Sequence, residues 1–211
     1  ATASGTLQLN GGLVRASVVQ PNGTPVSSII NFNGGTLQAA TNSTDFILSS
    51  AMVQSGGAVI DDGGYAVHLW SQGLQEDFAS PGGGLIKKGS GTLYIDSSVN
   101  LTGPVIVTNG TLAGVGAIVS PVVVGPAGKI GAGTEDLVGS LFINNTLTIQ
   151  GGASFRIDKT SGFTSSDSIA GITTVNYGGT LTITNVTSDA TPLADGDEFA
   201  LFNAGSHTGN F

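Results

Sequence analysis

The sequence predicts an all-β chain that winds as a single parallel β-helix, and three observations support this prediction. A short phrase of Gly or Asn, a small residue and an apolar residue recurs along the 211 residues, each time opening a run rich in β-branched residues. Within these runs apolar and polar residues alternate, which is the period of a half-buried strand. Gly, Asn and Pro interrupt the runs at short intervals, and no stretch has the periodicity of a helix.

The recurring phrase sets the period of the predicted helix. It begins at residues 5, 34, 56, 90, 109, 127, 139, 145, 151 and 178, and five of its glycines are Gly35, Gly57, Gly91, Gly110 and Gly128. These glycines are roughly 18 to 22 residues apart, except for one wider gap, and periods of about 20 to 50 residues mark stacked repeats. We therefore expect two or three short strands per turn, with Val, Ile and Leu stacked inside. A β-sandwich is the alternative, because its turn signals have similar spacing.

The stretch from Tyr65 to Trp70 contains the only tryptophan of the chain and one of its two histidines. If this stretch is a strand, Val67 and Leu69 point to one side, and His68 and Trp70 point to the other. The Val and Leu side must face the core. We therefore expect His68 and Trp70 to project outward, about 6.6 Å apart along the strand.

The segment at about 71–84 is too long for a corner of the helix, so we expect it to be a loop insertion. Long loops in compact domains are usually functional, and insertions in repeat proteins often lie on the binding face. Aromatic rings could form a platform for sugars, and amide and carboxylate groups could bind the hydroxyls. The alternative is that the tryptophan only anchors the loop. The expected ligand-binding residues are Trp70, His68, Gln72, Gln75, Glu76, Asp77, Phe78 and Tyr94.

Residues 82–116 contain two linked sequence segments. The first segment is Gly84, Leu85, Lys87, Gly89, Gly91, Thr92 and Leu93, and the second is Leu101, Thr102, Gly103, Pro104, Val107, Gly110, Thr111 and Leu112. Together they resemble the autotransporter-associated β-strand repeat. This resemblance implies a right-handed, single-stranded parallel β-helix in a secreted or bacterial cell-surface protein, and it says little about ligand or activity.

In its length and its repetitive β-strand sequence, the chain is also similar to non-catalytic modules of bacterial enzymes that degrade plant polysaccharides. The β-helical xylan-binding modules of carbohydrate-binding module family 89 have this architecture. The similarity implies a polysaccharide ligand, with xylan the first expectation, and a covalently linked glycoside hydrolase domain.

Apolar side chains continue into the C-terminal part of the chain. Phe142, Phe155, Phe199 and Phe202 stand in strand-like alternation, so we expect them in the core. The last ~40 residues either continue the rungs or form a cap, because an exposed rung is an edge that invites aggregation. We treat the whole chain, 1–211, as one β-helix domain that is a piece of a larger secreted protein.

The composition excludes two classes of function. Only six basic residues are present against fourteen acidic ones, whereas nucleic-acid binding needs several cationic contacts on one face. The longest apolar runs are far shorter than the ~20 residues that span a bilayer. We expect neither nucleic acid nor membrane as a partner, and we expect a monomer.

Candidate catalytic groups are sparse, so we do not expect an enzyme. A glycosidase needs two carboxylates flanking the scissile bond, but the acidic clusters here adjoin glycines and are interpreted as solvated corners. Arg15 and Arg156 have no obvious acidic partner in the sequence. The clusters are Asp61–Asp62, Glu76–Asp77, Glu135–Asp136 and the group Asp195, Asp197 and Glu198.

No cofactor is expected, and no metal site is assigned. Calcium at residues 194–199 or at Glu135–Asp136 is an alternative, although neither has the spacing of an EF-hand loop. The leading hypothesis is a non-catalytic carbohydrate-binding module that targets an attached glycoside hydrolase to the plant cell wall. The alternative is a structural stalk or adhesin passenger of an autotransporter-like surface protein, and a β-helical lyase or hydrolase is the third possibility.

Overall fold

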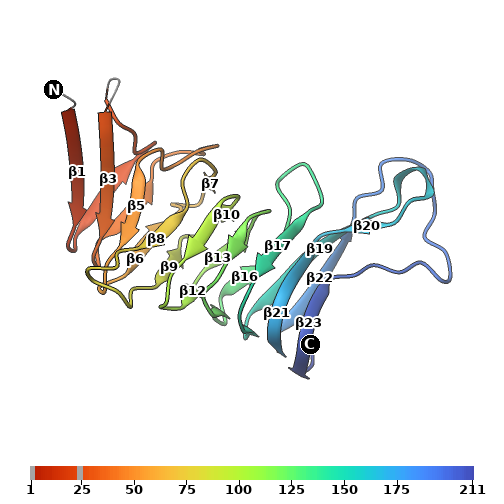
Figure 1. Ribbon diagram of the computed structural model, residues 1–211. Coiled ribbons are helices and arrows are strands. Elements are labelled where there is room, and N and C mark those ends of the chain that lie inside the picture. Colours follow the sequence, from red (N-terminus) through yellow and green to blue (C-terminus); the bar gives the residue numbers. More distant parts are fainter. Residues whose placement is uncertain (1–2, 23–25) are drawn as a thin grey trace.

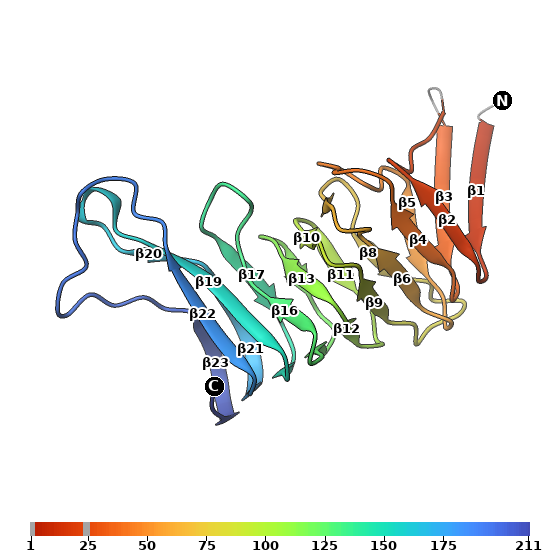
Figure 2. The same cartoon turned by 180° about the vertical axis from the view of Figure 1, so that it is seen from behind.

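The computed structural model describes residues 3–22 and 26–211, which form a parallel β-helix (Figure 1). The chain coils along one axis, with the N-terminal strands at one end and β22 and β23 at the other (Figures 1 and 2). Among the described residues, all strand pairs are parallel except the pairing of β19 with β20. This confirms the predicted helix, and the sandwich alternative is wrong because its sheets would be antiparallel.

Three columns of strands make up the three faces of the helix. The first and second faces belong to a single 16-stranded sheet, and the third face is a seven-stranded sheet. The first face contains β1 (Ala3–Leu9), β3 (Val26–Phe32), β5 (Ser50–Val53), β8 (Leu74–Glu76), β11 (Ser98–Asn100), β14 (Ala117–Ile118) and β17 (Ser140–Ile143). The second contains β2 (Leu13–Ala16), β4 (Thr36–Ala39), β6 (Ala58–Asp61), β9 (Leu85–Lys88), β12 (Val105–Val107), β15 (Val122–Val124) and β18 (Leu147–Ile149).

The third face carries the candidate site. Its strands are β7 (Ala66–Leu69), β10 (Thr92–Ile95), β13 (Gly110–Ala113), β16 (Gly128–Ile130), β19 (Gly152–Asp158) and β22 (Thr180–Asn185), and the short β20 (Ser165–Ser166) pairs with β19. A 3₁₀ turn, η1 (Thr160–Gly162), connects β19 to β20.

The two columns of the large sheet meet at its C-terminal end in β21 (Ser168–Tyr177). The first part of this long strand pairs with β17 and its last part pairs with β18. The final strand, β23 (Phe202–Gly209), stacks on β21. The C-terminal residues therefore continue the stack of strands, and the connection at 186–201 contains no strand.

Inside the helix, side chains of equivalent strands stack in ladders from rung to rung. On the third face one such ladder runs through Val67, Leu93, Leu112, Ile130 and Ala153, all of them buried. The ladders bury the apolar residues of every rung against the next one, which is the main stabilising term of a solenoid.

Two expectations about individual segments are corrected by the structure. The segment at 71–84 is not a simple loop insertion, because it contains β8, whose Leu74 is fully buried and pairs with Ala51 and Val99. Phe142 is not a core residue, because it is 46% exposed between the buried Leu141 and Ile143.

The other phenylalanines follow the prediction in part. Phe155 is buried and packs edge-to-face on Phe202, with ring centroids 4.9 Å apart. Phe202 is half-buried against the core. Phe199 is half-buried in the connection before β23 and lies outside any strand.

Candidate functional site

The strand β7 presents its side chains as its alternation predicts. Val67 and Leu69 are fully buried, His68 is half-buried on the outside, and Trp70 is 60% exposed just beyond the strand. On the next rung Tyr94 pairs with His68 across the parallel register. The outer surface of the third face thus carries aromatic groups on successive rungs.

His68 is held in place from two directions. Its ring stacks on the Tyr94 ring, with centroids 4.3 Å apart and an angle of 11° between the planes. Its Nδ1 lies 2.5 Å from Oδ2 of Asp96, whose side chain is fully buried. Burial, reinforced by the negative charge of Glu135, raises the pKa of the Tyr94 hydroxyl, so this group stays neutral at physiological pH.

A loop at 131–139, between β16 and β17, crosses this part of the third face and is visible in green in Figure 1. At its tip, Oε2 of Glu135 lies 3.0 Å from Nε2 of His68. Residues 68 and 135 come from rungs far apart in the sequence, so only the stacking of rungs brings them together.

The base of the same loop is fixed by an arginine. The guanidinium of Arg156 makes two hydrogen bonds with the Asp167 carboxylate, at 2.8 and 2.9 Å. It also donates to the backbone carbonyls of Glu135, at 3.0 Å, and Leu137, at 2.6 Å. The Asp167 carboxylate raises the pKa of Arg156 further above its ordinary value. Arg156 therefore has an acidic partner that sequence analysis missed.

Two hollows flank the loop on the outer surface of the third face, and Glu135 borders both. The larger, about 610 Å³, is lined by Asn42, Ser43, Thr44, Ala66, His68, Glu135 and Asp136. The smaller, about 300 Å³, extends over β10, β13, β16 and β19, and its lining includes Thr92, Tyr94, Thr111, Lys129, Ser154 and Arg156. We call these two hollows together the third-face groove.

The structure does not bring all the predicted site residues together. His68 and Tyr94 line the groove, and Trp70 follows β7 on the same outer side. Gln72 lies half-buried in the connection from β7 to β8. Gln75 projects from the first face and accepts a hydrogen bond from Asn100.

Glu76 is the last residue of β8 on the first face, and Asp77 and Phe78 follow it at the next corner. The Glu76 carboxylate is buried and accepts hydrogen bonds from the Thr102 hydroxyl and the Gly82 N–H. These bonds, led by the one from Thr102, lower the pKa of Glu76. Asp77 accepts from Gln54, and Phe78 is 88% exposed. Glu76 is therefore a structural group rather than a solvated corner residue.

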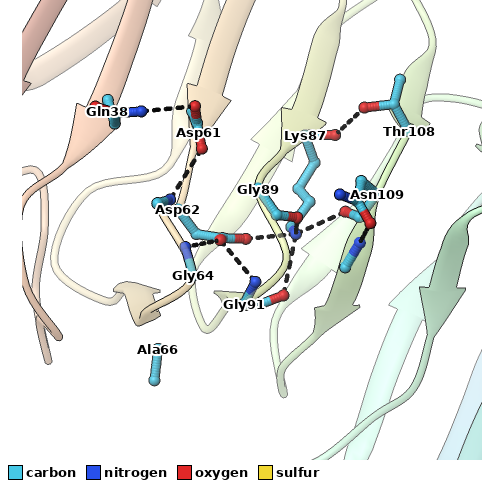
Figure 3. Close-up of polar contacts among 12 residues, drawn as sticks. Gln38, Asp61, Asp62, Gly64, Ala66, Lys87, Gly89, Gly91, Thr108 and Asn109 are labelled. Atoms are coloured by element: carbon cyan, nitrogen blue, oxygen red, sulfur yellow. Dashed lines mark hydrogen bonds and ion pairs between the residues drawn. The ribbon is translucent and has the colours of Figure 1, made fainter.

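Asp62 is a second carboxylate that was wrongly expected to be solvated. Its side chain is fully buried and forms an ion pair with Lys87, which is also fully buried (Figure 3). Oδ1 of Asp62 accepts hydrogen bonds from the N–H groups of Gly64 and Gly91, both 2.8 Å long. Because the whole cluster is closed to solvent, it stabilises the corner and offers no binding site.

The acidic loop at 194–199 is also tied internally. Lys159 donates a 2.7 Å hydrogen bond to Asp197, and this bond lowers the pKa of Asp197. The described residues contain no group of three or more His, Cys, Asp or Glu side chains that could hold a metal ion. Within the same residues, no helix has the length and apolar character needed to cross a membrane.

Comparisons with protein-family models, curated proteins and solved structures found no match to this chain. Any functional assignment therefore depends on the groove itself.

Proposed function

We propose that the chain is a non-catalytic polysaccharide-binding module and that a linear glycan lies along the third-face groove. The observation that carries this proposal is the lining of the groove, where hydroxyl groups from three rungs stand beside an aromatic stack. Thr92, Thr111 and Ser154 supply hydroxyls on three strands, and His68 stacks on Tyr94 at one end.

The geometry of the rungs suits a linear polymer. Adjacent strands of a sheet are about 4.8 Å apart, which is close to the length of one pyranose unit. A glycan that follows the helix axis would therefore present one sugar to each rung. The exposed Trp70 extends this surface beyond β7 and offers an indole face to the apolar side of a sugar ring.

Xylan is the first ligand to test, and an attached glycoside hydrolase is the expected partner. Binding would hold that enzyme on insoluble substrate and raise its effective concentration without new chemistry. A structural stalk of an autotransporter-like surface protein is the competing function, for which the rungs would provide only length.

The proposal is tested by affinity electrophoresis and calorimetry with soluble xylan, glucomannan and mixed-linkage glucan. Thr111 lies outward on β13 within the groove, so Thr111→Arg should block binding. The matched control is Thr36→Arg, because Thr36 is also half-buried but faces outward from β4 on the second face.

A second pair of variants tests the aromatic surface. Trp70→Ala should weaken binding, whereas Phe78→Ala removes a more exposed ring from a different corner and should leave binding unchanged. If no glycan is retarded by the folded wild-type protein, the binding function is wrong and the stalk is favoured.

A further inference from the structure

We infer that His68 is a receptor for the carboxylate of a uronic acid and that the chain's own Glu135 fills this receptor when no ligand is bound. The inference rests on the proposed glycan-binding function and names the class of sugar that the third-face groove selects. It predicts a preference for glycans that carry acidic sugars over neutral ones of the same length.

The ring of His68 is held between two carboxyl groups. Nδ1 faces Asp96 Oδ2 at 2.5 Å, and Nε2 faces the two Glu135 oxygens at 3.0 and 3.2 Å. A carboxylate oxygen thus lies within hydrogen-bond distance of each ring nitrogen, and the one at Nε2 belongs to a side chain that a ligand carboxylate could replace. Stacking on Tyr94 fixes the plane of the ring, so Nε2 remains directed toward the larger hollow.

One side of the His68 ring is held independently of Glu135. The side chain of Asp96 is fully buried, and among the described residues its Oδ1 has no hydrogen-bond partner. Among the described residues, His68 is the only basic side chain in contact with this carboxylate. Because the Asp96 carboxyl contacts Nδ1 and not Nε2, the ring keeps its orientation when Glu135 leaves.

Glu135 is well placed to leave. Its side chain is 44% exposed, in contrast to the fully buried Asp96. Arg156 holds the loop through the backbone carbonyls of residues 135 and 137, so the Glu135 side chain can swing away while the loop stays anchored. A ligand carboxylate in its place would restore the same charge-assisted hydrogen bond to Nε2.

The rest of the groove fits a neutral main chain with an acidic branch. The smaller hollow is lined by hydroxyl groups and by the exposed ammonium of Lys129. Within the described residues Lys129 forms no ion pair, whereas the guanidinium of Arg156 is already used by Asp167. A main chain on the hydroxyl rungs would place an acidic branch next to His68 and Glu135.

The test is calorimetry with two xylo-oligosaccharides of equal length, one unbranched and one carrying a single glucuronate branch. Wild type should bind the branched sugar more tightly. Glu135→Gln removes the internal competitor for His68, so it should raise the affinity for the branched sugar by about three- to fivefold. This factor corresponds to the free energy of a partly exposed ion pair. The affinity of this variant for the unbranched sugar should stay within about twofold of wild type. Glu198→Gln is the matched control, because it makes the same change at an exposed glutamate outside the third-face groove.

His68→Gln should reduce the ratio of the two affinities, branched over unbranched, by about tenfold or more. This factor corresponds to the free energy of a hydrogen bond to a charged group. This variant removes the ring that contacts the buried Asp96 side chain, so its melting temperature is measured first. If the variant unfolds, Glu135→Gln alone decides the outcome, because it changes only an exposed side chain.

Three outcomes would overturn the inference. Equal binding of both sugars by wild type, with no effect of Glu135→Gln, would reject the uronate receptor but leave glycan binding intact. An equal gain for both sugars in Glu135→Gln would make Glu135 a steric gate without preference for acids. Failure of both sugars to bind would reject the inference together with xylan as the ligand, and the proposed function would then depend on the other glycans.

Discussion

Lys87 and Asp62 form an ion pair in which both side chains are fully excluded from solvent. Lys87 occupies an inward position of the second face, where its neighbours in the ladder are Ile60 and Val107. Its ammonium also donates to the backbone carbonyls of Gly89, Gly91 and Asn109, at 2.9, 3.1 and 2.7 Å (Figure 3). One lysine thus joins the corners of three successive rungs.

We predict that Lys87→Met lowers the free energy of unfolding by about 3 to 5 kcal/mol, because removing one member of a buried pair leaves the other charge uncompensated. Burial lowers the pKa of Lys87, and the nearby Asp62 carboxylate opposes that shift. The measurement is chemical denaturation followed by circular dichroism.

The double variant Lys87→Met/Asp62→Asn separates the charge from the packing. An asparagine at 62 can still accept hydrogen bonds from the N–H groups of Gly64 and Gly91 through its side-chain oxygen. It carries no charge, so no uncompensated charge is left buried. The double variant should therefore regain part of the loss seen for Lys87→Met. A double variant less stable than the single one would show that the buried charge is not the cause.

Gly110 and Gly12 give a matched test of crowding at a corner. Both have positive φ, +65° and +71°, so alanine is strained at either position. At Gly110 an added Cβ would also collide with Lys87 Nζ and with the carbonyl oxygens of residues 89 and 91, whereas at Gly12 the space is open. We expect Gly12→Ala to lower the free energy of unfolding by about 1 kcal/mol. Gly110→Ala should lower it by clearly more, so its melting temperature should be the lower of the two. Equal losses would contradict the crowding argument.

These corners show what could and could not be predicted from the sequence. The rung period and the outward direction of His68 and Trp70 follow from glycine spacing and alternation, because both are local. The inward position of Lys87 was not predicted, although Leu85 and Lys87 share a side of β9 and the glycine at 110 leaves room for the ammonium. A lysine on the core side contradicts simple hydrophobic patterning.

The groove was harder to predict because its contacts join distant rungs. His68 and Glu135 are 67 positions apart, and their meeting depends on how many rungs lie between them and on the length of the loop at 131–139. Arg156 meets Asp167 because the chain turns back after β19 to form β20. Neither distance follows from local periodicity. The strand β8 was missed because only three residues form it.

Glu76 should contribute to acid sensitivity. Hydrogen bonds from Thr102 and Gly82 lower the pKa of Glu76 in the folded state. A carboxylate with a lowered folded pKa stabilises the protein fully above its unfolded pKa, about 4.3 for glutamate, and loses that contribution as the pH falls through the folded pKa. Glu76→Gln should therefore be less stable than wild type at pH 7 and lose less stability between about pH 6 and pH 3. Melting temperatures across this range provide the check, with the exposed Glu198→Gln as control.

Trp70 is the only tryptophan, so its fluorescence reports on a single position. Because the side chain is 60% exposed, the folded protein should emit like a solvated indole, and unfolding should shift the emission little. Binding of a glycan that covers Trp70 should shift the emission to shorter wavelength and reduce quenching by acrylamide. Thr111→Arg, which blocks the groove, should remove that change. A spectrum that already indicates a buried indole in the free protein would contradict the exposed position.

The loop at 131–139 should depend on the pair of Arg156 and Asp167 for its order. Arg156→Lys keeps the positive charge but loses the planar guanidinium that donates to Asp167 and to the two loop carbonyls. We expect a glutamate-specific protease to cleave after Glu135 several-fold faster in Arg156→Lys than in wild type, because local opening exposes the backbone. Cleavage after the exposed Glu198 serves as the internal control and should keep its rate. If both sites accelerate together, the variant has lost global stability; if neither does, Arg156 does not hold the loop.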